Sequence, residues 1–332
     1  MSKSPVFKAL AEVFAVIVDF LSMEYWVLAY YAIEKIENPH DLVAHHKEFL
    51  SSLDFRGRIY ISQQGINGQS SGSISHAKQY MDWLRSDPRF ARISFKVHPA
   101  LEHPFPKMTV KYRKQLVAID APVDFSQRAE PISPAIWKKM LENRSPQTLL
   151  LDVRNDYEWK AGHFEGAELP KLEQFRHFPE YARQLKLAHD PATVSVMMYC
   201  TGGIRCEFFS AFLKQEGFQK VYQLDGGVIQ YGLEEGGDHW LGKLFVFDDR
   251  LVIPLDERKD IIALCSFCKT KNDVYYNCAN MDCNALFFSC LNCLREHKGC
   301  CSDSCQDGRV RPFKENAKPF RKRAAERCDC ST

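Results

Sequence analysis

The chain has 332 residues, which is long enough for two or three domains. Its composition, 45% hydrophobic and 26% charged, is that of an ordinary soluble globular protein. The formal net charge of +2 is too small to indicate a nucleic-acid, membrane or acidic partner by itself. Any such partner must therefore be argued from the local distribution of charge.

The thirteen cysteines are unevenly placed along the chain. Nine of them fall between Cys265 and Cys305, two more are Cys328 and Cys330, and only two precede this block. Secreted disulfide frameworks are usually short chains behind a signal peptide. A long chain with one late cysteine block instead favours a metal site in a reducing compartment, so we expect a cytoplasmic protein.

Residues 1–22 are predicted to form an N-terminal extension. The segment Phe7–Leu21 is apolar, but Glu12 and Asp19 interrupt it and no small-residue cleavage pattern follows, which argues against a signal peptide. It is also too short and too charged to span a bilayer, so no membrane partner is expected. Its apolar residues share one helical face, which predicts an amphipathic helix. A true start at Met23 is the alternative.

Residues 23–123 are predicted to form a ferredoxin-like α+β domain, because the order is strand, helix, strand, hairpin-like return, helix and strand. The predicted strands are Trp26–Ile33, Arg58–Gln63 and Ile93–His98; the helices run from Asn38 or Asp41 to Leu53 and over Ser75–Ser86; Gly65–Gly68 is predicted to be a turn. The end of this domain is basic, with Lys107, Lys111, Arg113 and Lys114. This segment is either a solvated linker or strand, or a contact for nucleic acid.

Residues 132–244 are predicted to form an α/β domain with a parallel sheet, because buried strands alternate with helices. The strands are predicted at Leu149–Val153, Val194–Tyr199 and Val221–Leu224, and the helices at Ser133–Glu142, Phe175–Lys186 and Phe208–Glu216. In such sheets the reactive site lies outside the carboxyl ends of the strands, which is where Cys200 falls.

The residues after the central strand form a short loop that begins at Cys200. The loop continues through Thr201, Gly202, Gly203 and Ile204, and Arg205 follows. Backbone amides of a tight glycine loop and the positive end of a helix favour a thiolate, and the arginine adds a fixed positive charge. We therefore expect Cys200 to be a nucleophile rather than a buried structural cysteine.

A second cysteine, Cys206, lies six residues after Cys200, just inside the predicted helix. It is either a residue that packs the helix or a partner thiol that resolves a persulfide or sulfenic acid on Cys200.

Motifs of this region, taken in order, resemble a rhodanese domain. They are Asp152-Val153-Arg154, Glu158, Gly162-His163-Phe164-Glu165-Gly166-Ala167, the Cys200 loop and Leu224-Asp225-Gly226-Gly227. The resemblance implies that Cys200 is the active-site cysteine, a persulfide carrier, and that Asp152, Arg154 and Glu158 are structural charges that support the site. The related dual-specificity phosphatases place five residues between cysteine and arginine. Only four separate Cys200 from Arg205, so phosphatase activity is not expected.

Residues 255–306 are predicted to bind zinc. Their spacing supplies eight thiols, enough for two four-cysteine sites, and metal binding would supply folding energy that so short a segment lacks. The first expected grouping joins Cys265 and Cys268 with Cys290 and Cys293, and Cys278 and Cys283 with Cys301 and Cys305. His297 and Cys300 are substitute ligands, and a reduced or disulfide-paired cluster without metal is the alternative.

Residues 307–332 form a basic tail, which is either a solvated end or a further contact for nucleic acid. The tail includes Arg321, Lys322 and Arg323.

The whole arrangement, from Trp26 to Cys305, is similar to the bacterial tRNA uridine hydroxylase family. The resemblance implies hydroxylation of wobble uridine to 5-hydroxyuridine, with the tRNA anticodon region as partner and molecular oxygen as co-substrate. No flavin or haem motif is evident. The alternative is a rhodanese-type sulfurtransferase acting on thiosulfate or another donor; a non-enzymatic RNA-binding module is a third reading, against which the intact Cys200 loop argues. The sequence carries no signal for the oligomeric state.

Overall fold

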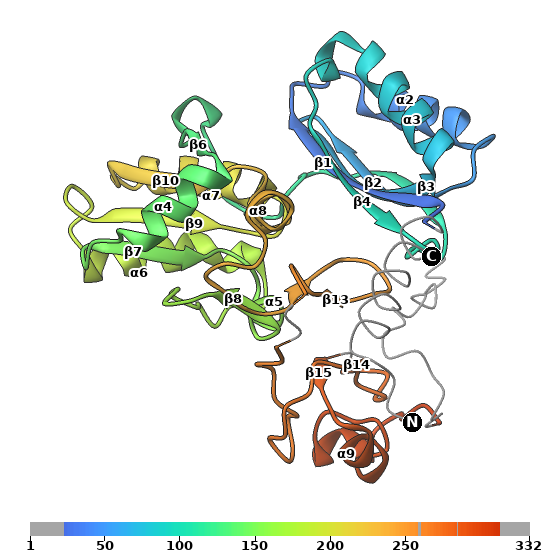
Figure 1. The fold of residues 1–332 in the computed structure, drawn as a ribbon, viewed down its shortest axis with the longest axis vertical. Helices are drawn as coiled ribbons and strands as arrows, with labels where there is room; N and C mark the ends of the chain where they lie inside the picture. The colour runs from blue at the N-terminus through green and yellow to red at the C-terminus, as the bar shows by residue number, and fades with distance from the viewer. Residues whose placement is uncertain (1–22, 258–259, 284, 313–332) are drawn as a thin grey trace, which may run out of the picture. The chain divides into compact units, whose positions relative to one another are not determined.

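The computed structural model describes residues 23–257, 260–283 and 285–312. The predicted N-terminal extension and most of the basic tail, including Arg321, Lys322 and Arg323, lie outside these residues. The described chain divides into two compact units, one of residues 23–118 with Phe247–Asp249 and one of residues 119–246 with 250–312 (Figure 1). In this part of the chain, no helix has the length and apolar character needed to cross a membrane.

The first unit is a five-stranded sheet with two helices on one face (Figure 1). Its elements are β1 (Tyr25–Ile33), α2 (Pro39–Leu50), β2 (Phe55–Ser62), β3 (Gly65–Ser73), α3 (Ile74–Ser86), β4 (Phe95–Ala100) and β5 (Met108–Tyr112). The strand order is β4-β1-β3-β2-β5, and only β5 pairs in parallel. Leu28, Ile59 and Tyr80 lie in the core between sheet and helices. The predicted ferredoxin-like fold is confirmed.

The predicted turn at Gly65–Gly68 is wrong. These residues begin β3, which pairs with both β1 and β2, and the chain reverses one step earlier at Gln63-Gln64. Gly68 lies opposite Tyr30, and a β-carbon at Gly68 would lie 2.0 Å from the Tyr30 ring. That glycine makes room for a buried aromatic ring rather than reversing the chain.

The second unit is built on a parallel sheet of order β6-β10-β9-β7. Its elements are β6 (Pro131–Ile132), α4 (Pro134–Glu142), β7 (Thr148–Asp152), α5 (Asp156–Trp159), β8 (Gly162–Phe164), α6 (Phe178–Ala188), β9 (Ser195–Tyr199), α7 (Ile204–Gln215), β10 (Lys220–Leu224), α8 (Gly227–Glu235), β11 (Trp240–Gly242), β12 (Leu244–Phe245) and β13 (Val252–Ile253). Helix α4 contacts α8, and α6 contacts α7. The predicted parallel α/β fold is confirmed.

Helices α7 and α8 both differ from the sequence-based expectation. Helix α7 begins at Ile204 rather than Phe208, because Gly203 serves as its N-cap. Arg205 and Cys206 are therefore in its first turn. Helix α8 was not predicted; it begins at Gly227, the second glycine of the pair that follows β10, with Gly226 as its N-cap.

The cysteine-rich segment belongs to the second unit and has little regular structure. It contains the antiparallel pair β14 (Tyr275–Asn277) and β15 (Leu286–Phe288), and the short helix α9 (Leu291–Glu296). The buried members of its hydrophobic cluster are Cys278, Phe287, Leu294 and Cys300. A core this small cannot offset the conformational entropy of the segment, so another source of folding energy is required.

Candidate active site

Cys200 lies at the carboxyl end of β9, one of the two inner strands of the parallel sheet. The strand is buried from Val196 to Tyr199, and the Cys200 side chain has no exposed area. Gly203, with φ of 99°, turns the chain so that its amide donates to the Cys200 sulfur at 3.1 Å. Few residues other than glycine adopt this backbone conformation, so Gly203 is what closes the loop around the sulfur.

A second loop holds the first one in place. The amides of Val228 and Ile229 donate to the carbonyl oxygens of Cys200 and Thr201, at 2.9 and 3.0 Å. Gly227 has φ of 67°, and a β-carbon there would lie 2.5 Å from the Cys200 carbonyl oxygen. Gly227 is thus part of the site although sequence reasoning did not select it. The signal was present in the glycine pair that follows β10.

Arg205 is held by Glu158 of α5. Its guanidinium donates to both carboxylate oxygens of Glu158, at 2.5 and 2.7 Å, and Thr201 Oγ1 donates to the same carboxylate at 3.0 Å. The Glu158 side chain is fully buried. Burial raises the pKa of this carboxyl, but Arg205 and other partners outweigh burial, so the pKa lies below its usual range. Glu158 is therefore a charged anchor for the loop.

Asp152 and Arg154 form a second buried ion pair at the same edge of the sheet. Arg154 donates to both carboxylate oxygens of Asp152, at 2.6 to 3.1 Å, and to the Gly162 carbonyl oxygen at 2.6 Å. Its guanidinium also lies over the rings of Tyr199 and Trp240. The pair therefore ties together the ends of β7, β8 and β9, and it does not contact the Cys200 sulfur among the described contacts.

The surroundings of Cys200 favour its thiolate. Burial raises the pKa of the thiol, but the Cys206 thiol, the Arg205 charge and the amides of Cys206 and Gly203 outweigh burial and lower the pKa to about 5. Burial raises the pKa of Cys206, and the hydrogen bond with Cys200 raises it further. Near neutral pH the pair therefore consists of a Cys200 thiolate that accepts a hydrogen bond from a Cys206 thiol.

We expect Cys206→Ala to raise the pKa of Cys200, because it removes the donor that opposes burial most strongly. Since thiolate is the form present above the pKa, its fraction at pH 6 falls in this variant. Cys206→Ser keeps a donor and is the matched control. The measurement is the pH dependence of Cys200 alkylation, followed by mass spectrometry. An unchanged midpoint in Cys206→Ala would show that the Cys206 thiol does not stabilise the thiolate.

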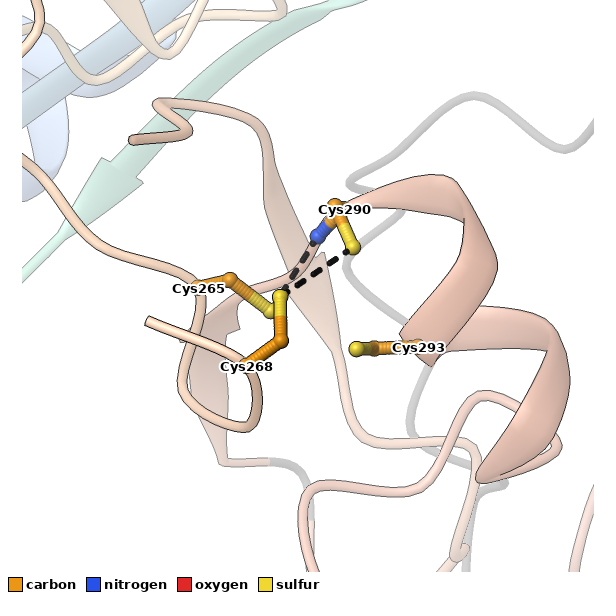
Figure 2. A group of neighbouring side chains, drawn as sticks. All are labelled: Cys265, Cys268, Cys290 and Cys293. Atoms are coloured by element: carbon orange, nitrogen blue, oxygen red, sulfur yellow. Dashed lines mark hydrogen bonds between the residues drawn. The ribbon is translucent and has the colours of Figure 1, made fainter. Parts of the chain in front are cut away.

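Eight cysteines of the cysteine-rich segment lie in two groups of four. The sulfur atoms of each group lie within 4.8 Å of one another, and the groups are Cys265, Cys268, Cys290 and Cys293 (Figure 2), and Cys278, Cys283, Cys301 and Cys305. These are the groups expected from the sequence spacing. Four thiols at this separation can hold one tetrahedral metal ion. Neither group includes His297, which stacks on Phe267, or Cys300.

The basic residues expected to contact tRNA are exposed in the first unit. Lys107 precedes β5, Lys111 lies on it, and Arg113 and Lys114 follow it. The Arg113 guanidinium lies 4.8 Å from the centre of the Tyr60 ring. Charged and aromatic groups are thus adjacent at the β2–β5 side of the sheet.

Comparison with known proteins identifies three family matches along the chain. Residues 25–116 match the UPF0176 acylphosphatase like domain, residues 133–233 the rhodanese-like domain, and residues 241–306 the rhodanase C-terminal domain. The chain is 54% identical to a protein of Chlamydia pneumoniae named tRNA uridine(34) hydroxylase, over 94% of this chain and 97% of that one. Proteins with the same name from Protochlamydia amoebophila and Chlamydia trachomatis serovar D are each 53% identical, over 90% and 91% of this chain and 94% of each relative. At this identity over nearly the full length of both chains, the protein belongs to the tRNA uridine(34) hydroxylase family.

Proposed function

We propose that this protein hydroxylates the wobble uridine of tRNA to 5-hydroxyuridine, with molecular oxygen as co-substrate. The observation that carries the proposal is the 54% identity to a named tRNA uridine(34) hydroxylase across 94% of the chain. The Cys200 loop supplies a group whose chemistry suits the reaction. Its thiolate is a strong nucleophile near neutral pH.

In the proposed reaction the Cys200 sulfur adds to C6 of uracil, which makes C5 nucleophilic. Amides of the loop stabilise the negative charge that develops on the base oxygen. Arg205 is already paired with Glu158, so its part is to hold the loop and add positive potential. C5 then reacts with oxygen. One oxygen atom stays on C5, and a two-electron reductant with two protons converts the other to water. Loss of the C5 proton then expels the Cys200 thiolate from C6, which restores the C5–C6 double bond and frees the enzyme.

The base must be unstacked and the loop must open before this addition. Cys200 is fully buried, while a β-carbon at Gly202 would meet no described atom within 4 Å. In the proposed reaction the base approaches the loop from the open space beside Gly202. Taking a base out of its stack costs a few kcal/mol, which contacts to the rest of the anticodon region would offset.

The test is nucleoside mass spectrometry of tRNA incubated in air with the purified full-length protein. The expected result is a gain of one oxygen on uridine at position 34.

The second candidate is a rhodanese-type sulfurtransferase, which the match to a rhodanese-like domain and the Cys200 thiolate favour. No gain of oxygen, together with thiocyanate production from thiosulfate and cyanide, would favour that second function. In an alternative mechanism, Cys200 carries the oxygen as a sulfenic acid and Cys206 is the thiol that resolves it. That mechanism predicts that Cys206→Ser loses hydroxylation.

The two cysteine groups are proposed to hold one structural zinc ion each. Four thiolates suit zinc, and the ions would supply the folding energy that the small core lacks. We expect two equivalents of zinc per chain by elemental analysis. Cys290→Ser should lose about one equivalent and lower the melting temperature, because three thiols hold zinc less tightly. Cys300→Ser is the control and should keep both. Iron with visible absorption would contradict the assignment to zinc.

The basic residues around β5 are proposed to contact the tRNA backbone. We expect Lys111→Glu with Arg113→Glu to weaken tRNA binding and to reduce the slope of log affinity against log salt by about two. Lys47→Glu with Arg92→Glu changes the net charge equally at other exposed positions of the same unit. Equal losses in both double variants would mean that general charge, rather than this patch, controls binding. The tail residues Arg321, Lys322 and Arg323 are proposed as additional contacts.

A further inference from the structure

The cysteine-rich segment contacts the helix that carries Glu158. Tyr275, in β14, is 1% exposed, and its hydroxyl donates to the carbonyl oxygen of Tyr157. Tyr157 immediately precedes Glu158, whose carboxylate holds both Arg205 and Thr201. The cysteine-rich segment is thus hydrogen-bonded to the peptide group between Tyr157 and Glu158, and Glu158 is the residue that anchors the Cys200 loop.

Aromatic rings extend this contact toward the first cysteine group. Tyr157 packs edge-on against Phe245 at 5.3 Å, and Phe245 packs against Tyr275 at 5.6 Å. Tyr275 in turn stacks on Phe288 at 3.8 Å. Phe288 ends β15, and Cys290 of the first group follows two residues later. Lys243, which lies between β11 and β12, also forms an ion pair with Asp273 of the cysteine-rich segment.

Helix α5 needs such support because it is a single turn of four residues. An isolated turn is not stable, so its position depends on tertiary contacts. Its Glu158 carboxylate must nevertheless meet four donors at hydrogen-bond distance: two nitrogens of Arg205, the hydroxyl of Thr201 and the amide of Asn155. The amide of Asp156 and the indole of Trp159 donate to the carbonyl oxygens of Leu172 and Pro170. The Tyr275 hydrogen bond adds a contact to the backbone directly before Glu158.

We propose that Tyr275 is a positioning residue for the Cys200 site, and that the cysteine-rich segment serves through it as part of the support of the active site. The inference rests on the proposed role of Cys200 as the reactive group. Without the Tyr275 hydroxyl, the Tyr157 carbonyl loses its donor, and α5 shifts to find another. Glu158 and Arg205 both remain, so their charges still offset each other. What degrades is the alignment of Thr201 and of the loop amides around the sulfur.

The test compares Tyr275→Phe with Tyr276→Phe in the full-length, metal-loaded protein. Both variants lose one hydroxyl on the same strand, but Tyr276 packs near Phe287 in the cluster around the second cysteine group. The readout is the pH midpoint of Cys200 alkylation by iodoacetamide. We expect a rise of about half a pH unit in Tyr275→Phe, since the amide hydrogen bonds that favour thiolate weaken. Tyr276→Phe should keep the wild-type midpoint.

A Glu158→Gln background shows whether Tyr275 acts through Glu158. There the effect of Tyr275→Phe on the midpoint should vanish, because interactions that run through one residue are not additive. An unchanged midpoint in Tyr275→Phe, or the same shift in the Glu158→Gln background, would overturn the proposal. A lower melting temperature alone would also count against it. Alkylation does not require tRNA or oxygen, so this outcome is independent of whether the protein hydroxylates uridine.

Discussion

Replacing Cys200 by serine should abolish hydroxylation of tRNA while the protein stays folded. Serine is close in size to cysteine and can accept the Gly203 amide that now points at the sulfur. Its hydroxyl does not ionise near neutral pH, whereas the pKa of the Cys200 thiol is lowered to about 5. Loss of the nucleophile from a covalent mechanism should lower the rate by a factor of about 1,000 or more.

The measurement is the gain of one oxygen on uridine 34, compared between wild type and Cys200→Ser under air. Cys300→Ser is the matched control, because it removes another fully buried cysteine by the same substitution. Melting temperatures and tRNA affinities should be similar in all three proteins. Full activity in Cys200→Ser would contradict the covalent mechanism and would mean that other residues carry out the reaction with oxygen.

Glu158→Ala should destabilise the protein strongly and abolish activity. The substitution leaves the Arg205 guanidinium largely buried without its carboxylate, and it frees the Thr201 hydroxyl. Removing one partner of a buried ion pair costs about 3–5 kcal/mol. The expected result is a loss of that size in the free energy of unfolding, measured by denaturant titration, together with loss of hydroxylation.

Asp156→Ala on the same helix is the control. Asp156 pairs with Lys160, which is about half exposed, so its loss should cost less than about 1 kcal/mol. Similar losses in the free energy of unfolding of the two variants would show that removing any charge from α5 destabilises the protein to the same extent as removing Glu158.

The pH dependence of stability gives a second test of Glu158. Its pKa in the folded protein is lowered, chiefly because Arg205 outweighs burial. A carboxyl with a lowered pKa contributes stability above its unfolded pKa, and that contribution is lost as the pH falls through the folded pKa. Wild type should therefore lose stability on acidification below about pH 4 more steeply than Glu158→Ala, since the unfolded pKa of glutamate is about 4.3.

Local patterns were sufficient for most elements of the fold. Buried strands such as Val194–Tyr199 and helices with one apolar face are visible in a few consecutive residues, so the ferredoxin-like and parallel α/β folds followed from their order. The prediction was wrong at a glycine that is required by a side chain on the neighbouring strand. Gly68 looked like a turn residue, but the requirement comes from Tyr30 on the adjacent strand.

Some residues of the candidate site could likewise be predicted from the sequence, and others could not. Cys200, Gly203 and Arg205 share one loop, so their chemistry could be inferred from adjacent residues and from where that loop falls in the sheet. The spacing of the cysteines gave only a first expected grouping, with His297 and Cys300 as substitutes, and the structure brings the members of that first grouping together. The roles of Gly227 and Tyr275 could not, because both depend on which distant backbone atoms they meet.

By itself, the sequence predicted Cys200 as the nucleophile, the order of the domains and the thiols available to a metal, and it carried the resemblance to the family that the comparisons show. These properties depend on residue type and on short spacings along the chain. Only the tertiary structure decided that Cys206 is the donor to the Cys200 thiolate, that Arg205 is committed to Glu158, and that the cysteine-rich segment contacts α5. Hydrogen bonds and burial depend on angstrom-scale distances between atoms far apart in the chain, and no local pattern specifies those distances.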